Sequence, residues 1–223
     1  MKKYPKYRNT GFHWIGEVPF NWLQVKLKYI SKIYTGNSLN LELKIKFGSN
    51  ETDGKPYIST KDINAKNNDV NYNSGITIPN NELSYKIANP GSFLLCIEGG
   101  SAGKKIGFIN QKSCFVNKLA CFDYKNKYLY YFAQSECFIN QFKGSITGLI
   151  GGVSLSSLKN FYAPFPSLKE QTQIAKFLDH KTGLIDQIIE KKKLLIKKLK
   201  KQRQAIINEA VTKGLNPNAK MKD

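Results

Sequence analysis

A glycine-rich run near the middle of the chain is the first feature that could do chemistry. Residues 99–103 precede Lys104 and Lys105 and resemble the phosphate-binding loop of nucleotide-binding proteins. That motif needs glycine at position 98 and serine or threonine at position 105, where this chain has Glu98 and Lys105. We therefore interpret the run as a turn between strands, whose lysines are candidates for contacts with phosphate.

Two further patterns are similar to catalytic motifs but lack essential features. Asn89–Phe93 resembles the Asn-Pro-Pro-aromatic signature of amino-methylating DNA methyltransferases but lacks its second proline, and no glycine-rich cofactor-binding strand precedes it. Asp186, Glu190 and Lys192 have the spacing of a metal-dependent nuclease site. Such carboxylates must converge on a cation. Here they lie in a predicted helix, so we expect them to be surface charges.

The cysteines and histidines indicate neither a metal site nor a nucleophilic triad. The two histidines, His13 and His180, are far apart, and no Cys-x-x-Cys pair occurs. A zinc site needs four clustered ligands, and a triad needs a histidine beside its nucleophile. We expect a chain that is not an enzyme, with no metal and no cofactor of its own. The cysteines then read as buried structural thiols: Cys96, Cys114, Cys121 and Cys137.

The charge of the chain favours a polyanionic partner. It carries 35 Lys and Arg against 16 Asp and Glu, a formal net charge of +19, which is typical of nucleic-acid-binding proteins. A lysine-rich genome would also raise this number. Arg8 and Arg203 are the only arginines, and arginine is the usual bidentate reader of guanine. Base readout would therefore depend on Lys, Asn, Gln, Ser and Thr.

No segment resembles a membrane anchor or a targeting signal. No apolar run approaches about 18 residues, and the first residues lead into no apolar stretch. We therefore expect no contact with a membrane and a cytoplasmic location. With 223 residues and 41% hydrophobic residues, the chain can form a packed core.

The elements that must position these side chains indicate an α+β fold over residues 1–167. Residues 22–33 have helix-like apolar spacing, and Tyr128–Phe142 suits a second helix because of its aromatic residues. Short apolar runs between Gly, Pro and Asn predict a mixed sheet. The strand candidates are residues 55–60, 75–78, 91–98, 105–110 and 114–124.

Residues 168–213 predict one long helix. Ser167 and Glu170 have the spacing of a capping box. Apolar residues then follow a heptad for about 67 Å, which is too long to bury on a domain about 40 Å across. We expect a partner helix, although a solvated lysine-rich appendage is the alternative. The predicted pairing positions, two of them polar and able to set register, are Leu178, Ile185, Ile188, Lys192, Leu195, Leu199, Gln202 and Ile206.

Two stretches of the chain carry a resemblance to a known family. Residues 14–22 have the pattern Trp-Ile-Gly-x-x-Pro-x-x-Trp, and residues 170–178 have Glu-Gln-x-x-Ile-Ala-x-x-Leu. Residues 206–215 extend the second stretch. Together they resemble the DNA-sequence-specificity subunit of type I restriction-modification systems. Residues 94–103, 115–117 and 144–147 also resemble features of that family's target-recognition domain.

The resemblance implies how the chain is organised. The family has two tandem copies of a recognition domain and a long helix, and the two helices pair as an antiparallel coiled coil that separates two DNA half-sites. Here we expect one copy: a target-recognition domain at 1–167, a spacer and dimerisation helix at 168–213, and a tail at 214–223 that resembles the start of a second copy. The unpartnered helix then predicts a homodimer on a bipartite inverted repeat.

The resemblance also implies the partners. We expect double-stranded DNA, methyltransferase subunits that carry S-adenosylmethionine and dock on the helix, and restriction or translocase subunits that use ATP and Mg²⁺. Polar residues near glycines in the recognition domain are our candidates for DNA contact, with lysines on phosphates and Asn, Ser and Thr on base edges. They are Asn37, Ser38, Thr60, Lys61, Ser101, Lys104, Lys105, Asn117, Lys118, Lys143, Ser145 and Thr147.

Two other classes of function stay open at this point. A stand-alone nuclease or methyltransferase would cleave or methylate DNA as a pure chain, although the catalytic motifs are incomplete. A truncated interaction subunit would bind methyltransferase subunits and change their specificity without tight DNA binding of its own.

Overall fold

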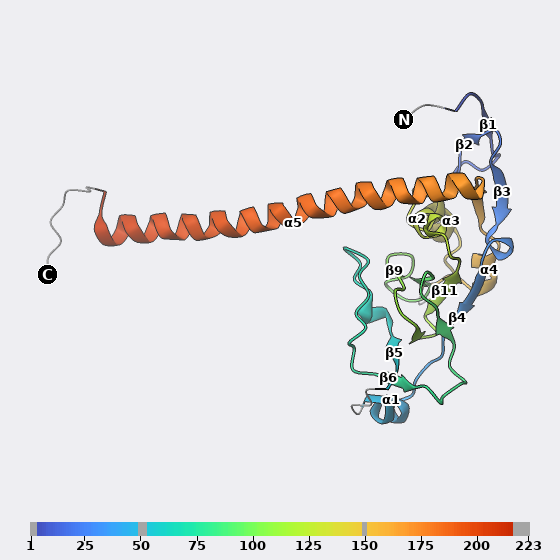
Figure 1. Ribbon diagram of the computed structural model, residues 1–223, viewed down its shortest axis with the longest axis horizontal. Coiled ribbons are helices and arrows are strands. Elements are labelled where there is room, and N and C mark those ends of the chain that lie inside the picture. The colour runs from blue at the N-terminus through green and yellow to red at the C-terminus, as the bar shows by residue number, and fades with distance from the viewer. Residues whose placement is uncertain (1–3, 49–52, 149–150, 216–223) are drawn as a thin grey trace. The chain divides into compact units, whose positions relative to one another are not determined.

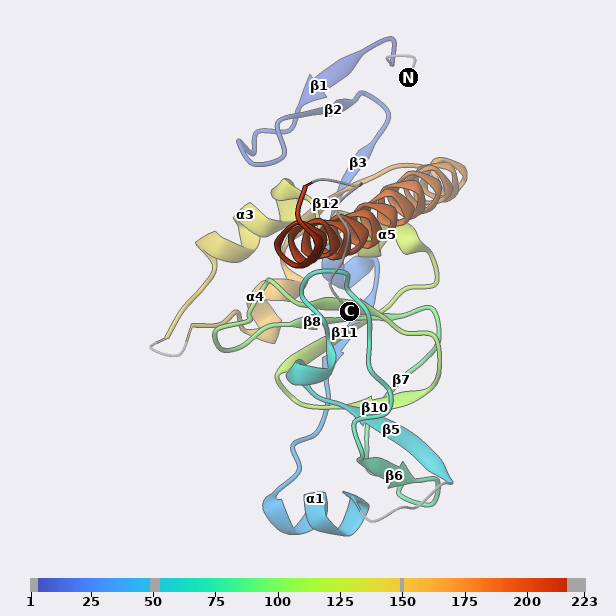
Figure 2. The same ribbon diagram turned by 90° about the vertical axis from the view of Figure 1, so that its left-hand side faces the viewer.

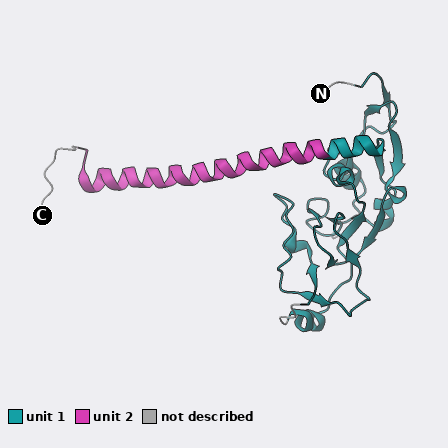
Figure 3. Ribbon diagram, in the orientation of Figure 1, with its two compact units in different colours: residues 1–175 teal, residues 176–223 magenta. Residues whose placement is uncertain are grey.

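The computed structural model describes residues 4–48, 53–148 and 151–215, which fall into two compact units (Figure 3). Unit 1 is residues 1–175 and unit 2 is residues 176–223. Figures 1 and 2 show the hairpin of β1 (Tyr7–Asn9) and β2 (Glu17–Pro19) at one end of unit 1 and α1 (Leu41–Gly48) with β6 (Thr77–Pro79) at the other. In the described part of the chain, no helix is both long enough and apolar enough to cross a membrane.

Unit 1 contains two four-stranded sheets. The central sheet has the order β4-β11-β8-β9 and is antiparallel throughout. The second has the order β6-β5-β10-β7, with β10 parallel to β5. The bounds of their strands are β4 Lys32–Thr35, β5 Gly54–Ile58, β6 Thr77–Pro79, β7 Ile87–Ala88, β8 Phe93–Cys96, β9 Ile106–Phe108, β10 Ser113–Phe115 and β11 Leu119–Asp123.

Two strand pairs and several short helices complete unit 1. β1 pairs with β2, and β12 pairs with β3, both antiparallel. These strands are β1 Tyr7–Asn9, β2 Glu17–Pro19, β3 Leu23–Lys26 and β12 Tyr162–Phe165. The helices are η1 Leu27–Tyr29, α1 Leu41–Gly48, η2 Thr60–Asp62, α2 Lys127–Phe132, α3 Glu136–Gly144 and α4 Leu155–Lys159.

The central sheet is buried on both faces, which explains why residues 93–97 form an unbroken apolar run. Phe93 and Leu95 pack with α2 and α3 on one face, and the Phe93 ring stacks on Phe122 with centroids 4.6 Å apart. Leu94 and Cys96 pack on the other face against residues of the second sheet. Because successive side chains of a strand point to opposite faces, both must be apolar. The mixed sheet-and-helix architecture predicted from the sequence is confirmed.

The helix expected at Trp22–Ile33 is wrong. This stretch forms β3, the single 3₁₀ turn η1 and the start of β4. The backbone N–H of Leu27 donates to the carbonyl of Phe161 at 2.9 Å, and β3 pairs with β12 over four residues. The partner strand lies about 140 residues further along, so local apolar spacing could not reveal it; tertiary pairing overrode the local preference.

Two other elements are divided where the sequence suggested continuity. The helix expected at Tyr128–Phe142 is two helices, α2 and α3, because Ser135 caps α3 by accepting from the N–H of Phe138. The strand expected at residues 114–124 is β10 and β11, which belong to different sheets and are joined by a turn at Val116.

The long helix α5 spans Leu168–Lys213, 46 residues and about 69 Å. The predicted capping box is present: Glu170 accepts from the N–H of Ser167, and the Ser167 hydroxyl accepts from the N–H of Glu170. The first turns belong to unit 1, where Gln171 and Ala175 are buried. The Gln171 side chain accepts from the Tyr124 hydroxyl at 2.6 Å. Residues 216–223 of the predicted tail lie outside the described residues.

Candidate nucleic-acid interface

Three loops that carry predicted DNA-binding residues meet at one end of the central sheet, where β8 ends and β11 begins. The N–H of Ile97 donates to the carbonyl of Lys118 at 3.0 Å, and the N–H of Gly99 donates to the carbonyl of Gly151 at 2.8 Å. Gly152 bridges Glu98 and Thr147. We call this region the recognition edge: residues 97–105, 116–118, 147–148 and 151–152 with η2.

Glycines give the recognition edge its shape. Gly99 and Gly103 have positive φ angles of 80° and 71°, so the turn between β8 and β9 adopts a conformation that other residues rarely take. A Cβ on Gly103 would lie 2.8 Å from the Phe142 ring, which places the end of α3 against this turn. Lys143, the next residue, is exposed beside it.

The two lysines after this turn have different surroundings. Lys104 is exposed, and its ammonium donates to the carbonyl of Gly100 at 3.2 Å. Lys105 is half-buried, and its ammonium donates to the carbonyl of Thr60 at 2.6 Å. From the sequence, both lysines are expected to contact DNA phosphate. In the structure, the hydrogen bond of Lys105 instead holds η2 against the turn. Lys104 is free to reach a phosphate.

Separate substitutions distinguish these two roles. Lys104→Ala is expected to weaken binding to every DNA sequence and to reduce the slope of log K against log salt by about 0.9, because one phosphate contact is lost. Lys105→Ala is expected to lower the free energy of unfolding by about 1–2 kcal/mol through loss of its hydrogen bond. Salt titrations of DNA binding and urea unfolding of both variants test this. An unchanged slope for Lys104→Ala would exclude a phosphate contact.

Asn37 lies next to the recognition edge and is held in place through its backbone and its side chain. Its N–H donates to the carbonyl of Phe115 at 2.9 Å, and its carbonyl accepts from the Tyr57 hydroxyl at 2.7 Å. Its side-chain oxygen accepts from the N–H of Lys86 at 2.9 Å. The side-chain oxygen of Asn37 is therefore occupied by this hydrogen bond. Its side-chain nitrogen is the group that could donate to a base. The neighbouring Ser38 is exposed.

The remaining candidates divide between the recognition edge and a separate pocket. Thr60, Lys61, Ser101, Asn117, Lys118 and Thr147 lie in the recognition edge, and all are exposed or half-buried. Lys118 forms an ion pair with Glu98 at 3.8 Å, which is weak because both side chains are solvated. Ser145 instead lines a pocket of about 460 Å³ beyond α3.

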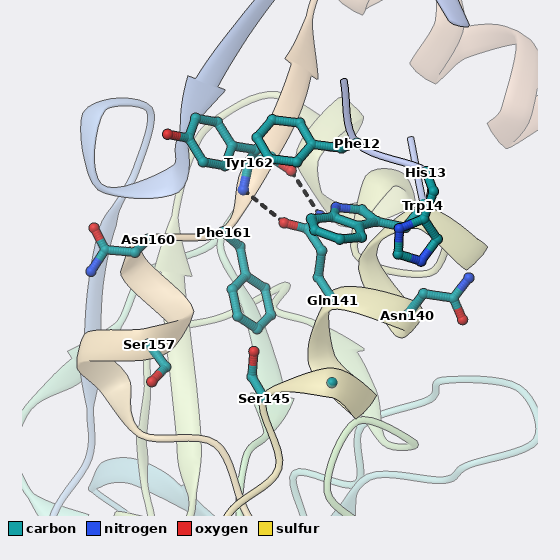
Figure 4. A pocket seen from close by; sticks show the side chains of 11 residues that line it. Phe12, His13, Trp14, Asn140, Gln141, Ser145, Ser157, Asn160, Phe161 and Tyr162 are labelled. Carbon is teal, nitrogen blue, oxygen red and sulfur yellow. Dashed lines mark hydrogen bonds between the residues drawn. The ribbon is translucent and has the colours of Figure 1, made fainter. Parts of the chain in front are cut away.

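Aromatic rings from the loop before β2 and from the start of β12 line part of that pocket (Figure 4). The ring of Phe12 lies 5.1 Å from that of Trp14 and 4.8 Å from that of Tyr162, measured between centroids. Gln141 fixes one wall, because its side chain both donates to and accepts from the backbone of Tyr162. The arrangement holds the loop before β2 against α3 and β12, so Ser145 lines this pocket while Thr147, two residues further on, pairs with Gly152 in the recognition edge.

The structure adds a lysine that sequence reasoning missed. Lys44 of α1 lines a pocket of about 280 Å³ together with Lys61 and Thr60 at η2. Buried Asp62 accepts from the N–H of Ser59 at 2.8 Å and forms the floor of this turn. Lys44 lies 16 residues before Thr60 in the sequence, and no motif or turn signal connects them.

The two stretches that carried the family resemblance contact each other. Glu170, at the start of α5, accepts from the Tyr4 hydroxyl at 3.1 Å and from the Trp22 indole at 3.4 Å. Burial acts to raise the pKa of Glu170, but hydrogen bonds from Ser167, Tyr4 and Trp22 outweigh it and lower this pKa. A carboxylate at a helix N-terminus also matches the helix dipole.

Among the described residues, no three His, Cys, Asp or Glu side chains cluster in a way that could hold a metal ion. Cys96, Cys114 and Cys121 are buried, as the sequence predicted, whereas Cys137 is half-buried. Burial raises the pKa of Cys114 to about 11, and it does the same for Cys121. These thiols therefore stay neutral in the folded chain.

The raised thiol pKa values predict a loss of stability in alkali. Above pH 9 the unfolded chain releases protons from Cys114 and Cys121 that the folded chain retains up to about pH 11. The free energy of unfolding should therefore fall between pH 9 and pH 11. Urea unfolding at pH 8 and pH 10 measures the loss, and a Cys114→Ala, Cys121→Ala double variant should lose less over the same interval. An equal loss in both proteins would contradict the assignment.

The comparisons with known proteins agree with the fold and with the motifs. The sequence profile of the family described as "Type I restriction modification DNA specificity domain" matches residues 19–198. The chain is 31% identical over 167 residues to the type I restriction enzyme MjaVIII specificity subunit of Methanocaldococcus jannaschii, covering 72% of this chain and 36% of that protein.

Two solved structures share the fold. The HsdS subunit of Thermoanaerobacter tengcongensis aligns with a TM-score of 0.62 and 21% identity over 94% of this chain. A chain from a study of assembly of the type I R-M system aligns with a TM-score of 0.72 and 20% identity, also over 94% of this chain. The chain spans 48% and 49% of these two chains, about half of each. It therefore belongs to the family of type I restriction-modification DNA specificity domains.

Proposed function

We propose that the chain is a non-catalytic DNA-recognition subunit of a type I restriction-modification enzyme. In this proposal unit 1 reads one half of a bipartite target, and two chains pair through α5 on an inverted repeat. S-adenosylmethionine is held by methyltransferase subunits, and ATP and Mg²⁺ are used by restriction subunits. The recognition edge supports the DNA-binding part, because exposed lysines lie beside Asn, Ser and Thr on closely spaced loops.

The observation that carries the pairing is an apolar stripe along unit 2. Ile185, Ile188, Leu195, Leu199 and Ile206 are 47–59% exposed, although each is a large aliphatic side chain. Their spacing places them on one side of the helix. A row of this length is stable in water only when covered, and a second copy offers the same stripe.

The distribution of charge favours an antiparallel pair over a parallel one. Residues 176–190 carry Asp179, Asp186 and Glu190 against two lysines, a formal net charge of −1. Residues 191–203 carry eight basic and no acidic residues. A parallel pair would align the two basic stretches, whereas an antiparallel pair aligns each basic stretch with the partner's acidic one. Such complementarity selects orientation in helix pairs.

A selection experiment tests this function. The purified chain is incubated with random double-stranded DNA, and bound sequences are enriched. We expect a bipartite inverted repeat with a spacer of constant length and unselected sequence, because a two-fold dimer imposes its symmetry on the target. Enrichment of a single non-palindromic site would contradict the homodimer. Absence of enrichment, with binding to a methyltransferase subunit, would instead support an interaction subunit without tight DNA binding.

A further inference from the structure

A run of positive charge in the middle of α5 exceeds what the pairing described above would neutralise, because residues 176–190 of a partner carry only three acidic residues. Residues 191–203 contain eight cations and no acid, and all eight are exposed. Lys193 pairs with Glu190 at 2.6 Å. The others have no ion-pair partner among the described residues. We call residues 191–203 the basic segment; its cations are Lys191, Lys192, Lys193, Lys197, Lys198, Lys200, Lys201 and Arg203.

Most of the basic segment faces away from the apolar stripe. With about 100° between successive residues, Lys197 and Lys201 lie about 160° around the helix from Leu199. Lys192 and Arg203 lie within the stripe, and the other lysines lie at its flanks or behind it. A second copy paired through the stripe would leave this lysine-bearing face uncovered.

This concentration of charge is unfavourable for an isolated helix. Lys197 has lysines four residues away on both sides, Lys193 and Lys201, and like charges at this spacing destabilise a helix. Solubility does not require them here, because the chain without these eight cations would still have a formal net charge of +11. Because these like charges destabilise the helix, we infer that a bound polyanion neutralises them.

We propose that the basic segment binds the phosphates of the DNA spacer between the two half-sites. This inference rests on the proposed function. In a homodimer on a bipartite target, the helix pair and the spacer duplex connect the same two recognition domains. The basic segment is about 20 Å long, and 20 Å of duplex carries about 12 phosphates.

The composition of the basic segment fits contact with DNA phosphates without recognition of the base sequence. Lysine is a compact point charge that contacts phosphate, whereas Asn, Gln, Ser and Thr read base edges. Residues 191–203 contain none of these four types except Gln202, which is a predicted pairing position in the stripe. The recognition edge differs, because it contains Asn, Ser and Thr as well as lysines.

Antiparallel pairing would also extend the charged surface. If two copies overlap along the whole of Leu168–Lys213, residues 191–203 of one chain lie beside residues 178–190 of the other. The two basic segments then follow one another along about 39 Å of the helix pair. The lysine-bearing faces of the two copies, each turned away from the partner helix, would then follow one another along the length of the pair.

The test compares charge-neutral variants on two DNA duplexes. The triple variant Lys197→Gln, Lys200→Gln, Lys201→Gln removes cations from the basic segment. The control Lys169→Gln, Lys176→Gln, Lys213→Gln removes the same charge from the same helix outside it. Each protein is titrated on the selected bipartite duplex and on the same duplex with neutral methylphosphonate linkages in the spacer. Light scattering and circular dichroism verify that all proteins have the same mass and helicity.

The proposal predicts that only the triple variant changes. Six contacts are lost per dimer, so the slope of log K against log salt should fall by up to about 5, and affinity should fall at least about tenfold. The unaltered chain and the control should bind the neutral-spacer duplex more weakly than the charged one, while the triple variant should show a clearly smaller difference between the two duplexes.

Other results would overturn the inference and separate it from the proposed function. Equal slopes for the triple variant and the control would show that the basic segment does not contact the spacer. A triple variant that keeps its DNA affinity but loses a methyltransferase subunit would assign the segment to an acidic protein surface. If the unaltered chain fails to bind bipartite DNA, the proposed function fails, and this inference fails with it.

Discussion

Leu195→Glu is expected to convert the dimer to a monomer and to lower affinity for the bipartite site by at least about 100-fold, or about 2.7 kcal/mol. Leu195 lies in the apolar stripe and is 47% exposed in the single chain. A carboxylate there would be buried between two helices in each half of the dimer, and burying an unpaired charge is costly. Both half-sites would then bind independently, without the gain from a linked pair.

The adjacent residue provides a matched control. Leu194 is 55% exposed, but it lies about 100° away from Leu195, outside the stripe. Leu194→Glu should therefore leave the solution mass and the affinity for the bipartite site within about twofold of the unaltered chain. If both substitutions dissociate the dimer, or neither does, the stripe is not the pairing surface. Light scattering and fluorescence anisotropy on the same samples provide the two readouts.

Gly36→Ala is expected to lower the free energy of unfolding by about 3 kcal/mol or more. An ideal Cβ at Gly36 would lie 1.8 Å from the carbonyl oxygen of Phe115, so β4 and β10 would have to separate. The hydrogen bond from the N–H of Asn37 to the same oxygen would be lost. DNA affinity should fall as well, because Asn37 and the turn after Phe115 belong to neighbouring parts of the interface.

Gly100→Ala controls for the loss of a glycine near the same loops. Its Cβ would meet nothing within 4 Å, and its φ is not positive. We expect its unfolding free energy to stay within about 0.5 kcal/mol of the unaltered chain. Urea unfolding followed by circular dichroism compares the two variants. A small effect of Gly36→Ala would show that β4 and β10 are not packed as described.

The elements that the sequence predicted well are those whose signals are local. The capping box at Ser167 and the heptad of α5 are complete within a few turns, so the helix was predicted to within one residue of its start. The run at residues 93–97 was apolar because β8 is buried on both faces. The failure at Trp22–Ile33 arose because β3 depends on β12, which no local pattern reveals.

The positions of the candidate DNA-contacting residues were predictable only in part, for the same reason. Glycine turns correctly indicated exposed loops, and the structure brings most of the chosen residues to one end of the central sheet. The structural bond of Lys105 to Thr60 depends on a contact across 45 residues. Ser145 lies near the others in sequence but lines a different pocket, because α3 turns its end toward Phe12 and Trp14.

The solution mass of the pure chain tests the central claim most directly. Pairing through α5 predicts a mass near twice 25.3 kDa by light scattering across micromolar concentrations. A mass near 25.3 kDa throughout this range would contradict the homodimer. The apolar stripe would then be covered by another subunit, and the chain would be one half of a divided specificity determinant.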